Sequence, residues 1–174
     1  IKIQAERSDL SRADLAKLQQ LHQGAVVALV RSQKLLQAQE FLESVVKLHP
    51  EWEFASRQLA SKELQEKNYV KAEKIFMDHL QQFPQANRLR ASMASLLFVP
   101  QKKHDEAKKH FAIALDHNPH DGFVRTDYAR FLLNTGKAKE ALAEMKIAPP
   151  LWKNSNQANY LITLFFHSIM CMAP

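Results

Sequence analysis

Four of the eight histidines have the greatest potential for chemistry, because they lie close together in the sequence. They are His104, His110, His117 and His120. Two histidines that bind one metal ion from a helix are typically four residues apart, so that both rings share a face. Here the first two separations are six and seven residues, and Asp116 and Asp121 are the only acidic neighbours of the last pair. The spacing therefore favours solvated histidines near a turn over a metal site.

Nucleophilic catalysis has little support in the sequence. Cys171, the single cysteine, lies at the tail of an apolar segment, where an inert thiol is expected. Only three glycines are present, and they form neither a nucleophile elbow around a serine nor a phosphate-binding loop. Asp105 and Glu106 coincide with an expected helix start, where acidic side chains complement the helix dipole. We expect a chain that is not an enzyme and needs no metal or cofactor.

Positive charge is the next feature that could bind a partner. The chain carries 24 Lys and Arg against 18 Asp and Glu, a net charge of +6. The densest cluster, Lys102–Lys109, contains four lysines. A basic surface attracts anionic partners without identifying them. Nucleic-acid readers usually add aromatic side chains for stacking, and this cluster offers only Phe111. A solvated helix start is the simpler interpretation, and a phosphate or acidic-peptide patch is the alternative.

Composition indicates one ordered domain. The chain has 174 residues, of which 46% are hydrophobic and 24% charged. A membrane-spanning helix needs about 18 consecutive apolar residues. The longest candidate, from Tyr160 to Met172, is shorter and contains His167. We therefore expect no membrane span. The single Cys171 is compatible with the cytoplasm, which is the expected compartment, and equally with a periplasmic segment.

An internal repeat organises most of the chain. Pro50, Pro84 and Pro119 are 34 and 35 residues apart, a period typical of stacked helical arrays. Twelve residues before each proline stands an alanine, and one more period adds a fourth. These residues are Ala38, Ala72, Ala107 and Ala141. A second small slot holds Val26, Ala60, Ala94 and Ala129. Two helices approach closely only where side chains are short, so these slots predict helix crossings.

The repeat resembles the tetratricopeptide repeat (TPR) family. The best-matching stretches run from His104 through Ala107 and Phe111 to Pro119, and from Tyr128-Ala129 through Gly136 to Ala141. The first repeat is degenerate, because His22 occupies a slot where a large apolar residue is expected. The resemblance covers residues 19–150 and implies a right-handed α-α superhelix. It implies fold more strongly than function.

Periodicity and turn residues predict an all-α fold with about four TPR-like helix pairs and an extra helix at each end. The expected segments are an entering helix over 1–18, repeats over 19–52, 53–86, 87–121 and 122–150, and a closing helix over 155–172. The spacing of 35 residues between Pro84 and Pro119 is one residue longer than the spacing before it. We assign this inserted residue to the loop Val99–Lys103. The closing helix is apolar on most of its circumference. Packing in the last groove and self-association through residues 156–170 are both consistent with that pattern.

First helices of a TPR array line its concave face, so residues there that packing does not require are free to bind. The register predicts these groove residues: Arg57, Gln58, Arg88, Ser92, Phe123, Asp127, Arg130 and Asn134. Arginines suit carboxylates, and Phe123 can anchor an apolar side chain. We expect a partner peptide with acidic groups. On this interpretation Arg88→Glu weakens binding and spares the fold.

The expected function is a non-catalytic scaffold that docks a partner peptide or helix in the concave groove, as part of a larger protein or assembly. One alternative is an RNA-processing or nucleic-acid-associated repeat module that uses the basic surface. Another is the docking region of a larger enzyme. Binding through several phosphates weakens steeply as salt rises, which separates the first alternative from groove binding.

Overall fold

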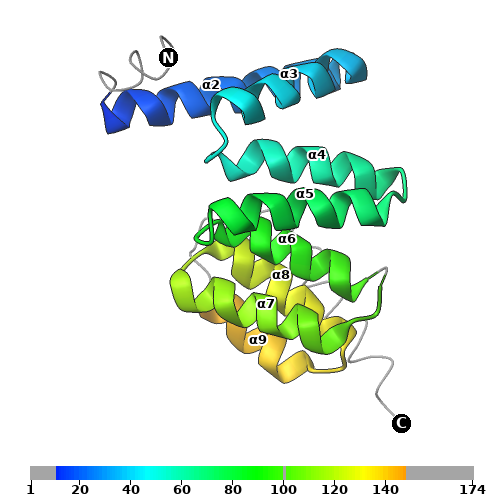
Figure 1. The fold of residues 1–174 in the computed structure, drawn as a ribbon. Coiled ribbons are helices and arrows are strands. Elements are labelled where there is room, and N and C mark those ends of the chain that lie inside the picture. Colours follow the sequence, from blue (N-terminus) through cyan, green and yellow to red (C-terminus); the bar gives the residue numbers. More distant parts are fainter. Residues whose placement is uncertain (1–10, 100, 148–174) are drawn as a thin grey trace. The chain divides into compact units, whose positions relative to one another are not determined.

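The computed structural model describes residues 11–99 and 101–147, and every regular element in these ranges is an α-helix (Figure 1). The eight helices of the described residues are α2 (Arg12–Arg31), α3 (Leu35–Leu48), α4 (Glu53–Gln65), α5 (Tyr69–Gln82), α6 (Asn87–Phe98), α7 (His104–His117), α8 (Gly122–Asn134) and α9 (Ala138–Ile147). The expected all-α fold is confirmed. The chain divides within α4 into two compact units, Ile1–Leu59 and Ala60–Pro174, which are taken in turn.

The first unit contains α2, α3 and the start of α4. Ser11 caps α2 by accepting a hydrogen bond from the Asp14 backbone N–H (3.2 Å). The sequence predicted a separate entering helix over 1–18, but residues 12–18 are the first turns of one continuous 20-residue helix. The physical reason is that residues 12–23 contain no glycine or proline that would end a helix there.

The degenerate first repeat is completed by aromatic contacts of histidine. The His22 ring stacks on Phe41 at 5.5 Å and meets Trp52 edge-on at 5.3 Å. The His49 ring also stacks on Trp52, with the two ring centroids 3.7 Å apart. Trp52 is also buried in the apolar cluster of this unit. Flat imidazole rings therefore do the packing that a large apolar residue does in the other repeats.

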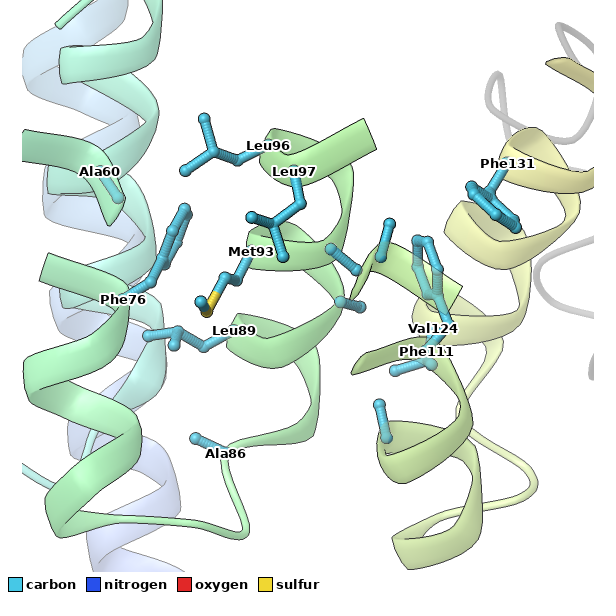
Figure 2. Close-up of a cluster of buried hydrophobic side chains, with 14 of the residues drawn as sticks. Ala60, Phe76, Ala86, Leu89, Met93, Leu96, Leu97, Phe111, Val124 and Phe131 are labelled. Atoms are coloured by element: carbon cyan, nitrogen blue, oxygen red, sulfur yellow. The ribbon is translucent and has the colours of Figure 1, made fainter. Parts of the chain in front are cut away.

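The second unit has one continuous core centred on α6 (Figure 2). This helix packs against α5, α7 and α8. Its buried side chains occupy most of its circumference: Leu89, Ala91, Met93, Ala94, Leu96 and Leu97. Phe76 from α5 and Phe111 from α7 fill the core beside α6 and are fully buried. Because α6 is buried over most of its circumference, it is the central layer of its unit.

Both predicted sets of small residues lie at buried positions. Ala72, Ala107 and Ala141 are 0%, 0% and 2% exposed in the second unit. Ala60, Ala94 and Ala129 are fully buried as well. The small residues of both slots are therefore buried, as a close approach of two helices requires.

The turn inside each helix pair repeats the same backbone geometry. One residue per turn has a positive φ: Gln33 (58°), Lys67 (62°), Lys102 (55°) and Gly136 (78°). The N–H of the next residue returns to a carbonyl five positions earlier, as in Asn68 to Glu63 (2.8 Å) and Lys137 to Leu132 (2.8 Å). In the third turn the N–H of Lys103 returns six positions, to the Leu97 carbonyl (2.9 Å). The inserted residue therefore lies in this turn, as the sequence predicted.

Only the fourth turn uses glycine at the left-handed position, which gives a stability prediction. A side chain in this conformation costs about 1–2 kcal/mol, partly offset for glycine by its greater freedom when unfolded. We expect Lys67→Gly to raise the free energy of unfolding by up to about 1 kcal/mol. Lys74→Gly, in the interior of α5, should lower it by about 1 kcal/mol. Urea unfolding checks both, and a loss of stability in Lys67→Gly would contradict the strain argument.

Candidate peptide-docking face

The predicted groove residues fall in both compact units. Arg57 and Gln58 lie on α4 in the first unit. The second unit carries the other six on α6 and α8, two helices that pack together. Arg88 and Ser92 are one turn apart on α6, and Phe123, Asp127, Arg130 and Asn134 follow one stripe of α8. We call these six residues the α6–α8 face.

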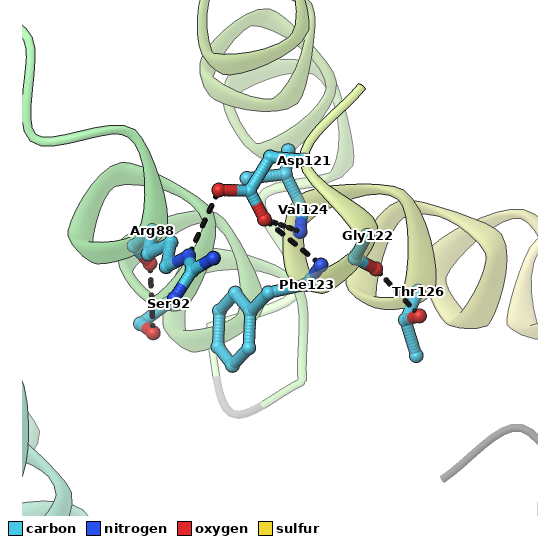
Figure 3. Close-up of polar contacts among 7 residues, drawn as sticks. All are labelled: Arg88, Ser92, Asp121, Gly122, Phe123, Val124 and Thr126. Atoms are coloured by element: carbon cyan, nitrogen blue, oxygen red, sulfur yellow. Dashed lines mark hydrogen bonds and ion pairs between the residues drawn. The ribbon is translucent and has the colours of Figure 1, made fainter. Parts of the chain in front are cut away.

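Arg88 is tied to the start of α8 (Figure 3). Asp121 is the N-cap of α8, and its Oδ1 accepts hydrogen bonds from the backbone N–H groups of Phe123 (2.9 Å) and Val124 (3.3 Å). Its Oδ2 accepts from Arg88 Nε at 2.8 Å. The Asp121 side chain is 7% exposed and that of Arg88 is 46% exposed. A single carboxylate thus caps α8 and fixes the guanidinium of α6.

The second arginine of this face also has an acidic neighbour. Arg130 Nη2 donates to Oδ1 of the buried Asp127 at 2.5 Å. Asn134 is exposed, and its side-chain amide donates to the Arg130 carbonyl (2.9 Å). Phe123 is half-buried, and its ring lies beside Arg88 and Ser92 in Figure 3. The α6–α8 face therefore carries one aromatic ring and two arginines, and each arginine has a carboxylate partner.

The Arg88–Asp121 pair changes the expected effect of Arg88→Glu. The sequence predicted a variant that keeps its fold, but the new carboxylate would face the buried carboxylate of Asp121. We now expect Arg88→Glu to lower the free energy of unfolding by about 1–3 kcal/mol, since it replaces a charge-assisted hydrogen bond with repulsion. Arg88→Gln should cost less than half as much. Equal urea midpoints for Arg88→Glu and the unaltered chain would contradict this role.

Sequence reasoning missed a buried ion pair between α8 and α9. The Arg125 side chain is about 10% exposed and donates from Nη1 to Glu144 Oε2, while its Nε donates to the Pro119 carbonyl at 2.5 Å. Glu144 is 19 residues from Arg125 in the sequence. No local spacing signals such a pair, because the two helices come together only when the unit folds.

The four clustered histidines lie in different surroundings. His104, His117 and His120 are exposed, and His117 Nδ1 lies 3.1 Å from the Asn87 side-chain oxygen. His110 differs from the expectation of a solvated turn histidine, because it lies in the middle of α7 and is half-buried. Among the residues that the structure describes, no three His, Cys, Asp or Glu side chains converge to hold a metal ion.

Acidic side chains lie close to a lysine of the basic cluster Lys102–Lys109. Lys103 Nζ lies 4.0 Å from Glu73 and 3.9 Å from Glu106. Lys102, Lys108 and Lys109 are exposed. These contacts reduce the positive field of the cluster, and its binding of phosphate, RNA or an acidic peptide stays a prediction.

The predicted closing helix 155–172, with its possible self-association through 156–170, lies outside the described residues. Within residues 11–99 and 101–147, no helix has the length and apolar composition needed to cross a membrane.

Comparison with known proteins agrees with this architecture. Residues 100–163 match the family model described as tetratricopeptide repeat. Among solved structures, a complex of the TPR2B domain of yeast Sti1 with pHsp70 covers 68% of this chain and 96% of that chain, with 15% identity and a TM-score of 0.56. The MamA RS-1 ArsTM double mutant covers 90% of this chain and 78% of that chain, with 16% identity and a TM-score of 0.50. A search of curated proteins finds no match.

The paired helices, the recurring turns and the buried small residues define an all-α helical-repeat protein. Residues 100–163 are similar to the tetratricopeptide repeat family, and the solved structures of similar fold agree with a helical-repeat architecture.

Proposed function

We propose that this chain is a non-catalytic protein-interaction scaffold that docks a peptide or helix of a partner protein on the α6–α8 face. The observation that carries the proposal is Phe123, a half-buried aromatic ring beside Arg88, whose guanidinium is held in place by Asp121. An aromatic anchor next to a fixed hydrogen-bond donor is typical of a site that binds side chain and backbone together. The yeast Sti1 domain of similar fold was solved in a complex, which supports the same class of function.

Charge balance on this face refines the expected ligand. Each arginine already has one carboxylate, so the face attracts acidic groups less strongly than two free guanidinium groups would. A guanidinium has five N–H donors and Asp121 uses only one of Arg88 in this structure, so hydrogen bonds to a carboxylate or a backbone carbonyl are still available. We therefore propose a ligand with one apolar side chain for Phe123 and an acceptor for Arg88. A cytoplasmic location is a further part of this proposal.

Selection of short random peptides displayed on phage, with nuclease present, tests the proposal. Peptides that enrich on the chain should lose affinity about tenfold or more on Phe123→Ala and on Arg130→Ala. Lys139→Ala, an exposed change on α9, is the matched control and should have no effect. Circular dichroism establishes that each variant is folded.

Peptides that bind all three variants with the same affinity would contradict the α6–α8 face as the docking site. A chain that yields no peptide and instead binds RNA, with affinity falling steeply between low and high salt, would favour the nucleic-acid alternative.

A further inference from the structure

A pocket lies elsewhere on the second unit, away from the α6–α8 face. This pocket of about 840 Å³ is lined by side chains from α5, α6 and α7. Its apolar lining is Val70, Met77, Leu80 and Met93. Figure 1 shows α6 between α5 and α7, and α6 packs against both helices. We call this site the α5–α7 pocket.

The α5–α7 pocket is separate from the α6–α8 face. Arg88 and Arg90 are two residues apart on α6, which places them about 200° apart around the helix axis. Arg88 joins the N-cap of α8, whereas Arg90 and Met93 line the pocket. The two sites share no residue, so a ligand could occupy one without the other.

Arg90 is the most unusual group in this pocket. Its Nη2 donates to the Pro84 carbonyl at 2.8 Å, while its Nε is buried and has no acceptor among the described residues. No described carboxylate lies within ion-pair distance of its guanidinium, and burial lowers the pKa of Arg90. A partly buried cation with no carboxylate within ion-pair distance is costly, so a ligand that supplies a close anionic acceptor would be stabilised there.

His110 adds a second polar group with no internal partner. Its Nδ1 is buried and makes no hydrogen bond within the part of the chain that the structure describes. Burial, and then the nearby charge of Arg90, lower the pKa of His110, although Glu106 acts in the opposite direction. The lowered pKa of His110 favours the neutral ring, which contributes hydrogen-bonding capacity without adding positive charge.

Two apolar side chains of α5 remain open to solvent at this site. Val70 is 83% exposed and Met77 is 55% exposed. Methionine adapts to many shapes and is frequent at surfaces that bind helices. The rim also carries Glu73, Asp78 and Glu106 against Lys74, so its outer charge favours basic residues at the ligand's edges. The groove between α5 and α7 thus has an apolar wall, a cation with no carboxylate within ion-pair distance and an acidic rim.

We propose that the α5–α7 pocket docks an amphipathic helix of a partner protein, which inserts an apolar side chain between Met77 and Met93 and places one carboxylate on Arg90. Basic residues at the edges of that helix face Glu73, Asp78 and Glu106. The pocket volume suits several side chains of a helix lying in a groove better than a single small molecule. This is a second docking site, independent of the one on the α6–α8 face.

A displayed library of alanine-based helical peptides, with the residues of one face randomised, tests this proposal on the full chain. We expect selected peptides to carry Asp or Glu three or four positions from a Leu, Met or Phe. Replacing that acid by its amide should weaken binding about tenfold or more, and Arg90→Gln should do the same. Methyl-¹³C methionine spectra should show shifts of Met77 and Met93 on binding, with Met145 as the internal reference.

Matched variants keep the test decisive. Met77→Lys should abolish binding, because the lysine puts a charge on the apolar wall of the pocket. Met77 is exposed, so this variant keeps the proposal testable even if Arg90→Gln fails to fold. Leu142→Lys, an exposed apolar change on α9, should have no effect, and neither should Phe123→Ala. The last variant separates this site from the α6–α8 face.

Three outcomes would overturn the proposal. The library could yield no binder, or its peptides could bind Met77→Lys as well as the unaltered chain. Alternatively, the free chain could self-associate and become monomeric in Met77→Lys, which would assign the pocket to a second copy of the chain.

Discussion

Replacing Ala107 with arginine is expected to unfold the second unit. Ala107 is fully buried on α7, the helix that packs most extensively on α6. The arginine side chain has no space at this contact, and its charge would have no partner there. Overpacking combined with a buried charge should lower the free energy of unfolding by more than about 4 kcal/mol, a large part of the stability of a domain of this size. Far-UV circular dichroism and urea unfolding measure the effect.

Ala112→Arg is the matched control, because it places the same side chain on an exposed position of the same helix. We expect it to change the free energy of unfolding by less than about 0.5 kcal/mol. If Ala107→Arg kept the urea midpoint of the unaltered chain, the repeat register would be wrong. Loss of structure in both variants would instead point to a general intolerance of α7 to arginine.

Removing Glu144 is expected to have the second largest effect. Glu144→Ala leaves the Arg125 guanidinium buried without its carboxylate, which should cost about 3 kcal/mol. Arg125→Met should cost less, since the Glu144 side chain is 21% exposed and can be hydrated. Urea unfolding of the single variants and of Arg125→Met/Glu144→Leu completes a double-mutant cycle. The double variant should recover most of the loss, because apolar contacts replace the ion pair.

A spectroscopic measurement checks the same pair independently. The pKa of Tyr128 is raised by burial and, to a lesser extent, by the negative charges of Glu144 and Glu140. Glu144→Ala should therefore move the pKa of Tyr128 back toward its ordinary value, which ultraviolet titration of the phenol detects. A cost below about 0.5 kcal/mol for Glu144→Ala would mean that the pair behaves like an exposed surface salt bridge.

The helical repeat could be predicted from the sequence because its determinants are local and periodic. Small residues at Ala72, Ala107 and Ala141 recur where helices must approach closely, and the structure buries all three. The inserted residue was placed correctly because a longer turn is the least costly place for it. The predicted boundary of the entering helix was wrong, because the helix capped by Ser11 continues through Arg31. A pattern of repeats does not show whether two expected helices are joined when no residue between them ends a helix.

The candidate site could be predicted only as a set of positions. Helical periodicity places Arg88 and Ser92 on one face of α6, and Phe123 on the matching face of α8, whatever the partner. Periodicity could not show that Arg88 is held by Asp121 or that Arg130 lies against Asp127, because a side chain's partner depends on its rotamer and on neighbouring helices.

By itself the sequence determined the class of fold, the repeat register and the residues that separate one helix from the next, since these depend on spacing along a single chain. Only the tertiary structure decided which charges are compensated. Arg125 is buried against Glu144, 19 residues away, whereas Arg90 has no described carboxylate within ion-pair distance. The physical reason is that the free energy of a charge depends on burial and on the distance to its counter-charge, and both are fixed only when the helices pack.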